Sequence, residues 1–358
     1  MQQDYSTART NNTRGLELKS LLPKELAGHF FGVGSLGELD PSKAVEYVKN
    51  LKLPYAYSIT HLPEEDMIRQ FGVLADGFEE EGDFILNVDI HAFREMVEDS
   101  EPLMLDKQHG HSYYLLNDGT HYPLFKTQQT APATMCFSIR NTSGKQHINR
   151  TMFLYFQKLM QRIAVGQTLF LSEFCGTIIL CQDDPSLGFV TEMAMADSSL
   201  GLTLKDIFHR TDSIYPENVI PAFHYCYDWR QMNLDGWFPL WESKPKLVHI
   251  DLVRFPPEVN LEQAEKMNGF MKNGGGLALG VLPNVDDMYN KSILDTLKEN
   301  LKHDLDLLQK SGVSLDLLKR NTMVSTQCGL SGASPELSQS IHLESSKFQD
   351  VFFQVLEK

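Results

Sequence analysis

The feature that most restricts the fold is a repeated order of short apolar runs and amphipathic segments. Each apolar run has the length of a strand, and the segments between them carry apolar side chains at helical spacing. Predicted strands cover residues 29–34, 54–59, 133–139, 176–181, 219–226, 246–252, 277–282 and 323–326. Predicted helices cover residues 41–51, 149–165, 202–209, 261–272, 292–311 and 335–356. This alternation predicts an α/β fold, a (β/α)8 TIM barrel, with an open doubly wound sheet as the alternative.

The chain length suits one barrel, since α/β barrels of about 250 residues and more are common. We therefore predict a single TIM-barrel domain over residues 1–358, with residues 1–15 disordered. The stretch between the second and third predicted strands is too long for one strand–helix unit. Residues 70–128 are predicted to form an insertion at a barrel end, in which Asn117-Asp118-Gly119 is typical of a hairpin turn.

Composition restricts the partners and the compartment. Hydrophobic residues make up 42% of the chain and charged residues 22%, which fits a globular protein with a large core. No run approaches the ~20 apolar residues of a membrane span, and the first thirty residues hold no secretory apolar region. A formal charge of −15 argues against nucleic acid and anionic membranes as partners. Five cysteines without a disulfide framework favour a reducing, cytoplasmic location.

The tripeptide His224-Tyr225-Cys226 indicates a metal site. In a strand the side chains of His224 and Cys226 project to the same face, and Cys328 follows the last predicted strand. Functional residues of a barrel lie at the carboxyl ends of its strands, so we expect these three side chains on one rim. One imidazole and two thiolates suit zinc and leave a fourth coordination position free. The alternative is two ordinary buried thiols beside a core imidazole.

Two further residues lie on the predicted strand 246–252. Asp251 ends this strand on the same rim, as a fourth ligand or as an acceptor for the imidazole N–H, or else as a cap of the next loop. His249 precedes it by two residues, so it shares that face one layer deeper. We interpret His249 as a core imidazole with a hydrogen-bond partner.

The ends of two other strands carry candidate substrate contacts. Asp183 and Asp184 follow the predicted strand 176–181, where they bind a substrate amine or simply terminate the strand. Gly34 and Ser35 end the first strand, where backbone N–H groups and a hydroxyl could hold a substrate carboxylate. A lone Gly-Ser pair carries little information without other signals.

Short motifs also occur in a consistent order along the chain. They are Val33-Gly34-Ser35, the segment 54–70 with Leu62-Pro63, the segments 130–134 and 181–187, His224-Tyr225-Cys226 and the segment 327–330. In these motifs, from about residue 30 to 340, the chain resembles the cobalamin-independent methionine synthase / uroporphyrinogen decarboxylase superfamily. It is most similar to single-barrel members that are like the carboxyl-terminal domain of methionine synthase.

The resemblance implies a methyltransferase that transfers a methyl group to a zinc-bound thiol, as in methionine biosynthesis. By position, His224, Cys226 and Cys328 would be the zinc ligands, and Asp183 and Ser35 would contact the amino-acid part of a substrate. Zinc keeps a thiol deprotonated at neutral pH and holds its sulfur in place for attack. Homocysteine or a small thiol such as coenzyme M is the implied acceptor.

The chain departs from the family pattern at two points. Asp251 stands where methionine synthases have a glutamate ligand, and Asp184 replaces a glutamate; catalytic roles are assigned to both aspartates. The segment 285–288 holds no histidine, whereas the family has one there that passes a proton to the folate leaving group. A methylated corrinoid protein is therefore the favoured donor. The alternatives are a lyase or decarboxylase that needs no metal, and a non-catalytic binding protein with a vestigial site.

Overall fold

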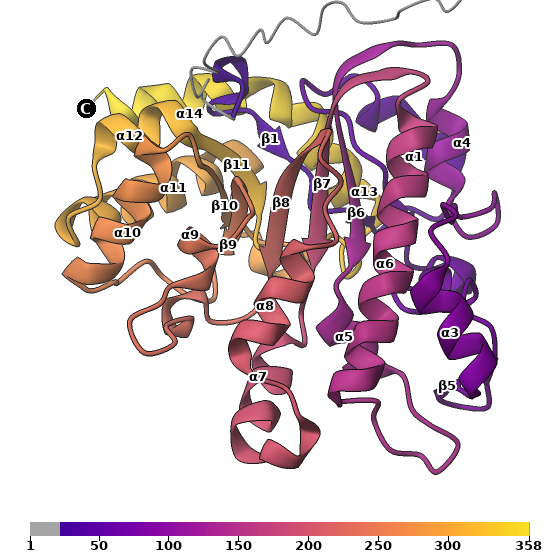
Figure 1. Ribbon diagram of the computed structural model, residues 1–358. Coiled ribbons are helices and arrows are strands. Elements are labelled where there is room, and N and C mark those ends of the chain that lie inside the picture. Colours follow the sequence, from indigo (N-terminus) through magenta and orange to yellow (C-terminus); the bar gives the residue numbers. More distant parts are fainter. Residues whose placement is uncertain (1–21, 358) are drawn as a thin grey trace, which may run out of the picture.

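The computed structural model describes residues 22–357, so the predicted disorder of residues 1–15 lies outside the described part. Its centre is a curled sheet of parallel strands with helices packed on the outside (Figure 1). The strands follow the order β1-β11-β10-β9-β8-β7-β6. Their bounds are β1 (Phe30–Phe31), β6 (Tyr122–Thr130), β7 (Cys175–Asp183), β8 (Val219–Tyr225), β9 (Leu247–Asp251), β10 (Gly276–Leu282) and β11 (Thr322–Thr326).

The hydrogen-bonded sheet does not close into the predicted eight-stranded barrel. Between β1 and β6 lie residues 54–59, which are linked to their neighbours by short pairings. Tyr55 bridges to β6, and β3 (Ser58–Ile59) pairs with β2 (Ser35–Leu36). The chain bends between β1 and β2 at Gly34, whose φ of 154° interrupts the strand. The prediction is therefore confirmed for a curled parallel α/β sheet but not for a closed barrel.

One predicted strand is wrong. Residues 133–139 fall in a helix, α5 (Pro132–Ser138), and the third parallel strand is β6 instead. Pro132 at the first helical position suits a helix start and not a central strand. The sequence does not predict β6 because polar side chains, such as the fully buried Lys126, interrupt its apolar pattern.

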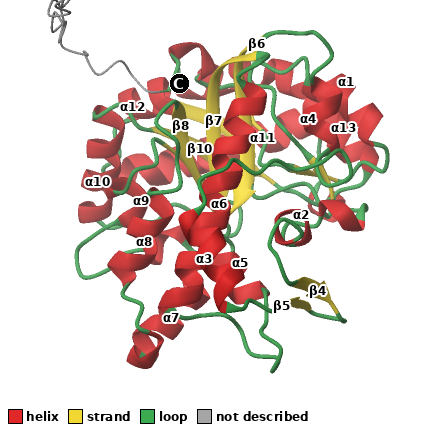
Figure 2. Ribbon diagram, turned by 45° about the vertical axis from the view of Figure 1, so that its right-hand side comes forward, coloured by secondary structure: helices red, strands yellow, loops and turns green. Residues whose placement is uncertain are grey.

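The region between β3 and β6 contains a hairpin, though not at the predicted turn. An antiparallel pair, β4 (Phe78–Glu80) and β5 (Phe84–Leu86), lies beside α2 (Arg69–Gly72) and apart from the main sheet (Figure 2). Two helices follow, α3 (Ile90–Glu98) and α4 (His111–Leu116). The Asn117-Asp118-Gly119 turn joins α4 to β6, so its assignment to a hairpin is wrong.

The helices cover the outer face of the sheet, and two of them, α1 (Pro41–Val48) and α13 (Pro335–Glu344), begin at a capping residue that precedes a proline. Asp40 and Ser334 cap α1 and α13 by accepting hydrogen bonds from backbone N–H groups of the first turn, and a proline follows each cap. The remaining bounds are α6 (Arg150–Leu171), α7 (Leu187–Ala196), α8 (Leu204–Asp212), α9 (Pro239–Glu242), α10 (Leu261–Lys272), α11 (Ile293–Lys310), α12 (Leu315–Asn321) and α14 (Phe348–Leu356). Across residues 22–357, none of these helices has the length and apolarity of a membrane span.

Two apolar clusters determine where a site can form. The larger cluster packs the helices against the sheet. The smaller one fills the inside of the curled sheet and includes Phe31, Ile179, Ala222, Leu247 and Met323. On four of the strands, polar residues follow these apolar residues on the same face, toward the carboxyl end: Asp183, His224, His249 and Ser325. The inside of the sheet is therefore apolar at one end and polar at the other.

Candidate metal centre

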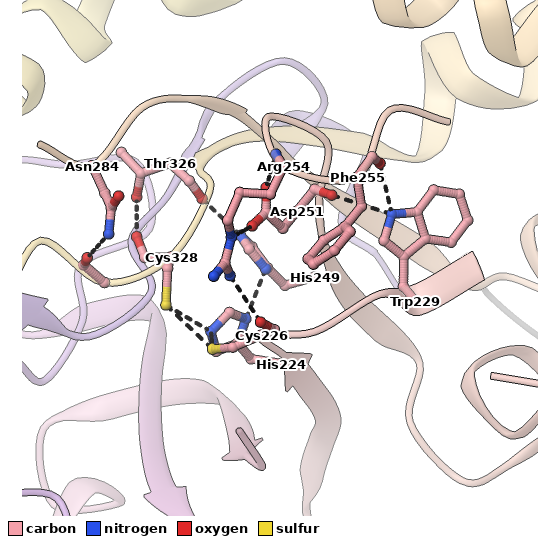
Figure 3. Close-up of polar contacts among 11 residues, drawn as sticks. His224, Cys226, Trp229, His249, Asp251, Arg254, Phe255, Asn284, Thr326 and Cys328 are labelled. Carbon is pink, nitrogen blue, oxygen red and sulfur yellow. Dashed lines mark hydrogen bonds and ion pairs between the residues drawn. The ribbon is translucent and has the colours of Figure 1, made fainter. Parts of the chain in front are cut away.

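The three predicted metal ligands meet at the carboxyl end of the sheet. His224 lies near the end of β8, Cys226 follows that strand, and Cys328 follows β11. The strands β9 and β10 separate β8 from β11 in the sheet, so the curl of the sheet brings their ends together. Figure 3 shows the imidazole facing both sulfurs. Nε2 of His224 lies 2.6 Å from Sγ of Cys226 and 3.6 Å from Sγ of Cys328, and the two sulfurs are 3.2 Å apart.

This donor set fits a zinc ion. The three ligand atoms lie within 4.8 Å of one another, and the His224 side chain is buried. Tetrahedral zinc with bonds of ~2.3 Å to sulfur and ~2.0 Å to nitrogen sets ligand separations of roughly 3.8 Å between sulfurs and 3.5 Å between sulfur and nitrogen. The observed arrangement reaches these values if the side chains spread by up to about 1 Å. Two sulfurs and an imidazole are also the ligand types that zinc prefers.

The electrostatics of the cluster favour one thiolate. A hydrogen bond from Cys226, supported by His224, lowers the pKa of Cys328 to about 4. The pKa of Cys226 is raised well above 9.0, first by its hydrogen bond to the Cys328 sulfur and then by burial. Burial lowers the pKa of His224, but the Cys328 thiolate outweighs it and the pKa lies above 6.5. The two sulfurs therefore share one proton at neutral pH.

The triad lies beside a cavity of about 500 Å³. Side chains of His224, Cys226 and Cys328 line one part of its wall. The other lining residues come from the ends of several strands and from the segment after β3. They include Gly34, Ser35, Glu65, Met67, Gln128, Asp183, Arg254 and Asn284. A concave site whose polar side chains converge beside a candidate metal centre is suited to binding a small molecule.

Asp251 lies next to the triad but is not part of it. Its buried carboxylate accepts a hydrogen bond of 2.5 Å from Nε of Arg254 and one of 3.0 Å from the backbone N–H of Arg254. Burial raises the pKa of Asp251 above 3.8 despite these bonds. The guanidinium also donates to the carbonyl of Cys226 at 2.8 Å. Arg254 thus forms an ion pair with the Asp251 carboxylate, for which the sequence predicts a role as metal ligand or catalytic group.

The neighbouring aspartates differ in position. Asp183 ends β7 opposite His224 in the strand register and lines the cavity, and burial raises the pKa of Asp183. Asp184 lies behind it, where Oδ1 accepts hydrogen bonds from the N–H and the hydroxyl of Thr134 at 3.1 and 2.6 Å. Burial raises the pKa of Asp184 to about 7, and within residues 22–357 its Oδ2 atom has no hydrogen-bond partner. Asp184 therefore supports the start of α5, away from the lining of the cavity.

Gly34 and Ser35 line the cavity, as expected for substrate contacts. A Cβ atom at Gly34 would approach the Gln128 side chain to 2.9 Å. The Ser35 carbonyl accepts the N–H of Leu330 at 2.9 Å, and the Ser35 hydroxyl leaves no room for a side chain at Gly329. These contacts fix β2 against the loop that carries Cys328.

Sequence reasoning missed Gln128, Arg254 and Asn284, and it separated His249 from the metal site. Gln128 belongs to the unrecognised strand β6, and Asn284 follows β10. Arg254 stands three residues after Asp251, a spacing that could have suggested an ion pair. His249 is fully buried as expected, yet its Nδ1 lies 2.7 Å from Nδ1 of His224. No local sequence pattern predicts this contact, because the two histidines lie on different strands.

Comparison with known proteins supports the fold. No family model and no curated protein matches the sequence. Among solved structures, the fold is similar to that of a B12-independent methionine synthase from Shewanella sp. W3-18-1 in complex with selenomethionine, with a TM-score of 0.56. The likeness covers 93% of this chain and 99% of that one at 14% sequence identity, a level that shows the fold alone. The chain therefore has the fold of a cobalamin-independent methionine synthase, as the order of its motifs predicts.

Proposed function

We propose that the protein is a zinc-dependent methyltransferase that methylates a small thiol such as homocysteine or a coenzyme-M-like compound. The observation that carries this proposal is the meeting of His224, Cys226 and Cys328 beside a cavity. Three protein ligands beside an open cavity are typical of a catalytic zinc site. The methionine synthase fold supports the same reaction class by analogy.

The chain's own side chains would prepare the acceptor. A zinc ion in the triad supplies a Lewis acid that keeps the acceptor sulfur deprotonated at neutral pH. The acceptor would release its thiol proton to solvent on binding. A lone pair of its sulfur would then form the new S–C bond, while the electrons of the broken donor–methyl bond leave with the donor. The triad side chains hold the reacting sulfur at one end of the cavity, so that the remaining lining can orient the rest of the substrate.

Charged groups of the cavity suit an amino-acid or acidic thiol. The Asp183 carboxylate faces the cavity and can pair with a substrate ammonium group. Arg254 is about half exposed and, within residues 22–357, uses two of its nitrogens for Asp251 and Cys226, so other N–H groups remain for a substrate anion. Ser35 and the backbone at Gly34 offer further hydrogen bonds.

The segment 285–288 favours a donor that leaves without a proton. Asp286 in this segment accepts hydrogen bonds from the N–H and hydroxyl of Ser334 at 2.8 and 2.6 Å, and so holds the start of α13. The segment contains no imidazole for protonating a folate leaving group. A methyl-corrinoid carries off the bonding electron pair on its cobalt and needs no such proton. We therefore propose a methyl-corrinoid protein as the donor.

Metal content tests the ligand assignment. We expect about one zinc per chain in protein purified under reducing conditions, and a loss of zinc in Cys226→Ser and Cys328→Ser. Cys136→Ser, at a buried cysteine of α5, is the matched control and should keep its zinc. Full zinc content in both ligand variants would contradict the ligand assignment. Wild-type protein that contains no zinc would favour the metal-independent lyase or the non-catalytic binding protein.

Thiol binding and turnover then test the reaction. X-ray absorption at the zinc edge should show a further sulfur ligand when homocysteine or coenzyme M is added. With methylcobalamin as the donor probe, mass spectrometry should detect the methylated thiol, and Cys328→Ser should abolish it. A coordination shell that no thiol changes would favour a non-catalytic binding protein.

A further inference from the structure

We propose that His249 is a positioning residue, which fixes the proton on the metal ligand His224 and links both ligand segments through a buried hydrogen-bond relay. The proposal rests on the zinc site proposed above, but not on the identity of the acceptor or donor. The relay runs from His224 through His249 to Thr326, and from Thr326 to Cys328.

Three hydrogen bonds between four residues define the relay, and Figure 3 draws them. Nδ1 of His249 lies 2.7 Å from Nδ1 of His224, on the side of that ring away from the sulfurs. Nε2 of His249 lies 2.8 Å from the carbonyl oxygen of Thr326. The hydroxyl of Thr326 donates to the carbonyl of Cys328 at 2.7 Å. The relay therefore reaches both segments that carry metal ligands.

The carbonyl at one end determines the proton positions. A carbonyl oxygen only accepts hydrogen bonds, so Nε2 of His249 carries a proton. Neutral His249 then has a lone pair on Nδ1, which makes Nδ1 of His224 the donor of their mutual bond. Because that proton occupies Nδ1, the lone pair for a metal lies on Nε2 of His224, and this atom faces the two sulfurs. A second proton on His249 would place a charge at a fully buried site, which is costly.

The sheet supplies the geometry for this contact. His224 and His249 are register partners on the parallel strands β8 and β9. Their rings meet edge to face with centroids 4.4 Å apart, and the Phe31 ring stacks on His249 at 6.0 Å. On the other side, Ala278 of β10 is the register partner of His249, and its small side chain leaves the path to Thr326 open. These neighbours restrict the His249 ring to one orientation.

Gly280 of β10 keeps the far end of the relay in place. A Cβ atom at this position would lie 2.9 Å from the Thr326 carbonyl oxygen and 2.9 Å from Cα of Gln327. The pairing of β10 with β11 is also irregular between Gly280 and Leu282. The Thr326 carbonyl thus turns toward His249 where the ladder is interrupted, at the start of the loop that carries Cys328.

Two substitutions at position 249 test the two hydrogen bonds of the His249 imidazole separately. The amide of His249→Asn can replace Nδ1 as an acceptor for His224, whereas the amide of His249→Gln can replace Nε2 as a donor to Thr326. We expect zinc affinity, measured by competition with a chelator, to fall 10- to 100-fold in His249→Gln and His249→Phe, and by clearly less in His249→Asn. His342→Gln is the control, because His342 is also buried and hydrogen-bonded, to Tyr55 and to the Ser338 carbonyl, and should leave the affinity unchanged.

Nitrogen-15 NMR of the unsubstituted protein tests the proposal without relying on any variant to fold. We expect a protonated Nδ1 on His224 and an unprotonated Nδ1 on His249, with and without zinc. The reverse protonation, or wild-type zinc affinity in folded His249→Gln and His249→Phe, would refute the relay. These measurements use zinc alone, so a protein that shows the relay but transfers no methyl group would refute the proposed function and leave the relay standing.

Discussion

If the two cysteines share one proton, zinc binding at the proposed site should depend on pH in a specific way. Zinc needs both sulfurs as thiolates and Nε2 of His224 as a lone pair. The pKa of Cys328 is about 4, so this thiol is already ionised at neutral pH and releases no proton. The pKa of Cys226 lies well above 9.0, so this thiol must release its proton when the metal binds. The pKa of His224 lies above 6.5, so the imidazole contributes a second proton at lower pH.

The size of the effect follows from this proton count. Release of one proton raises the zinc association constant tenfold per pH unit, which is about 1.4 kcal/mol. Between pH 7.5 and 8.5 we therefore expect a tenfold tighter binding wherever His224 is neutral. Below the pKa of His224 the dependence should steepen toward a hundredfold per unit, because two protons are then displaced. Affinity rises with pH in both ranges, since zinc competes with protons for the same atoms.

Chelator competition at several pH values gives the slope, and calorimetry in buffers of different ionisation enthalpy gives the number of protons released. Cys226→Ser should bind zinc more weakly and lose the Cys226 contribution to the slope. Cys175→Ser, at a buried cysteine outside the triad, should keep the wild-type slope. An affinity that is independent of pH from 7.5 to 8.5 would refute the shared proton.

Three further predictions concern residues around the triad. The pKa of Asp184 is about 7 when folded and 3.8 when unperturbed, so the wild type loses stability as pH rises from about 4 to 7; Asp184→Asn should remove this loss, on the order of 4 kcal/mol. Urea unfolding of both proteins at pH 4.5 and pH 8 measures this loss of stability. An equal loss between these pH values in the wild type and in Asp184→Asn would contradict the prediction. Gly329→Ala places a Cβ 2.0 Å from the Ser35 hydroxyl, so it should lower the free energy of unfolding by about 1–3 kcal/mol and weaken zinc binding. Adding Ser35→Ala removes this hydroxyl and should restore part of the stability and part of the zinc affinity. Arg254→Gln leaves the buried Asp251 carboxylate without its partner and should lower the midpoint of thermal unfolding. Adding Asp251→Asn should recover part of this loss. A double variant whose loss of stability equals the sum of the two single losses would argue against this pairing.

Much of the fold could be predicted because its signals are local. The predicted helices 261–272 and 292–311 match α10 and α11 almost to the residue, since apolar spacing depends on neighbours along one element. The strand β6 could not be predicted in the same way. Its inward side chains are polar, with Lys126 buried against the Val33 carbonyl, so the pattern that marks a buried strand is missing. Closure of the sheet was also beyond local signals, because it depends on how the bend at Gly34 shifts the end of the first strand.

The amino-acid sequence by itself determined which chemical groups could meet, because strand alternation puts His224 and Cys226 on one face and parallel strands bring Cys328 to the same rim. Only the tertiary structure decided what surrounds them. The Asp251 carboxylate pairs with Arg254 and His249 contacts the imidazole of His224, and neither contact can be read from spacing. The physical reason is that contacts between strands depend on register and on the curl of the sheet, which the packing of the whole chain sets.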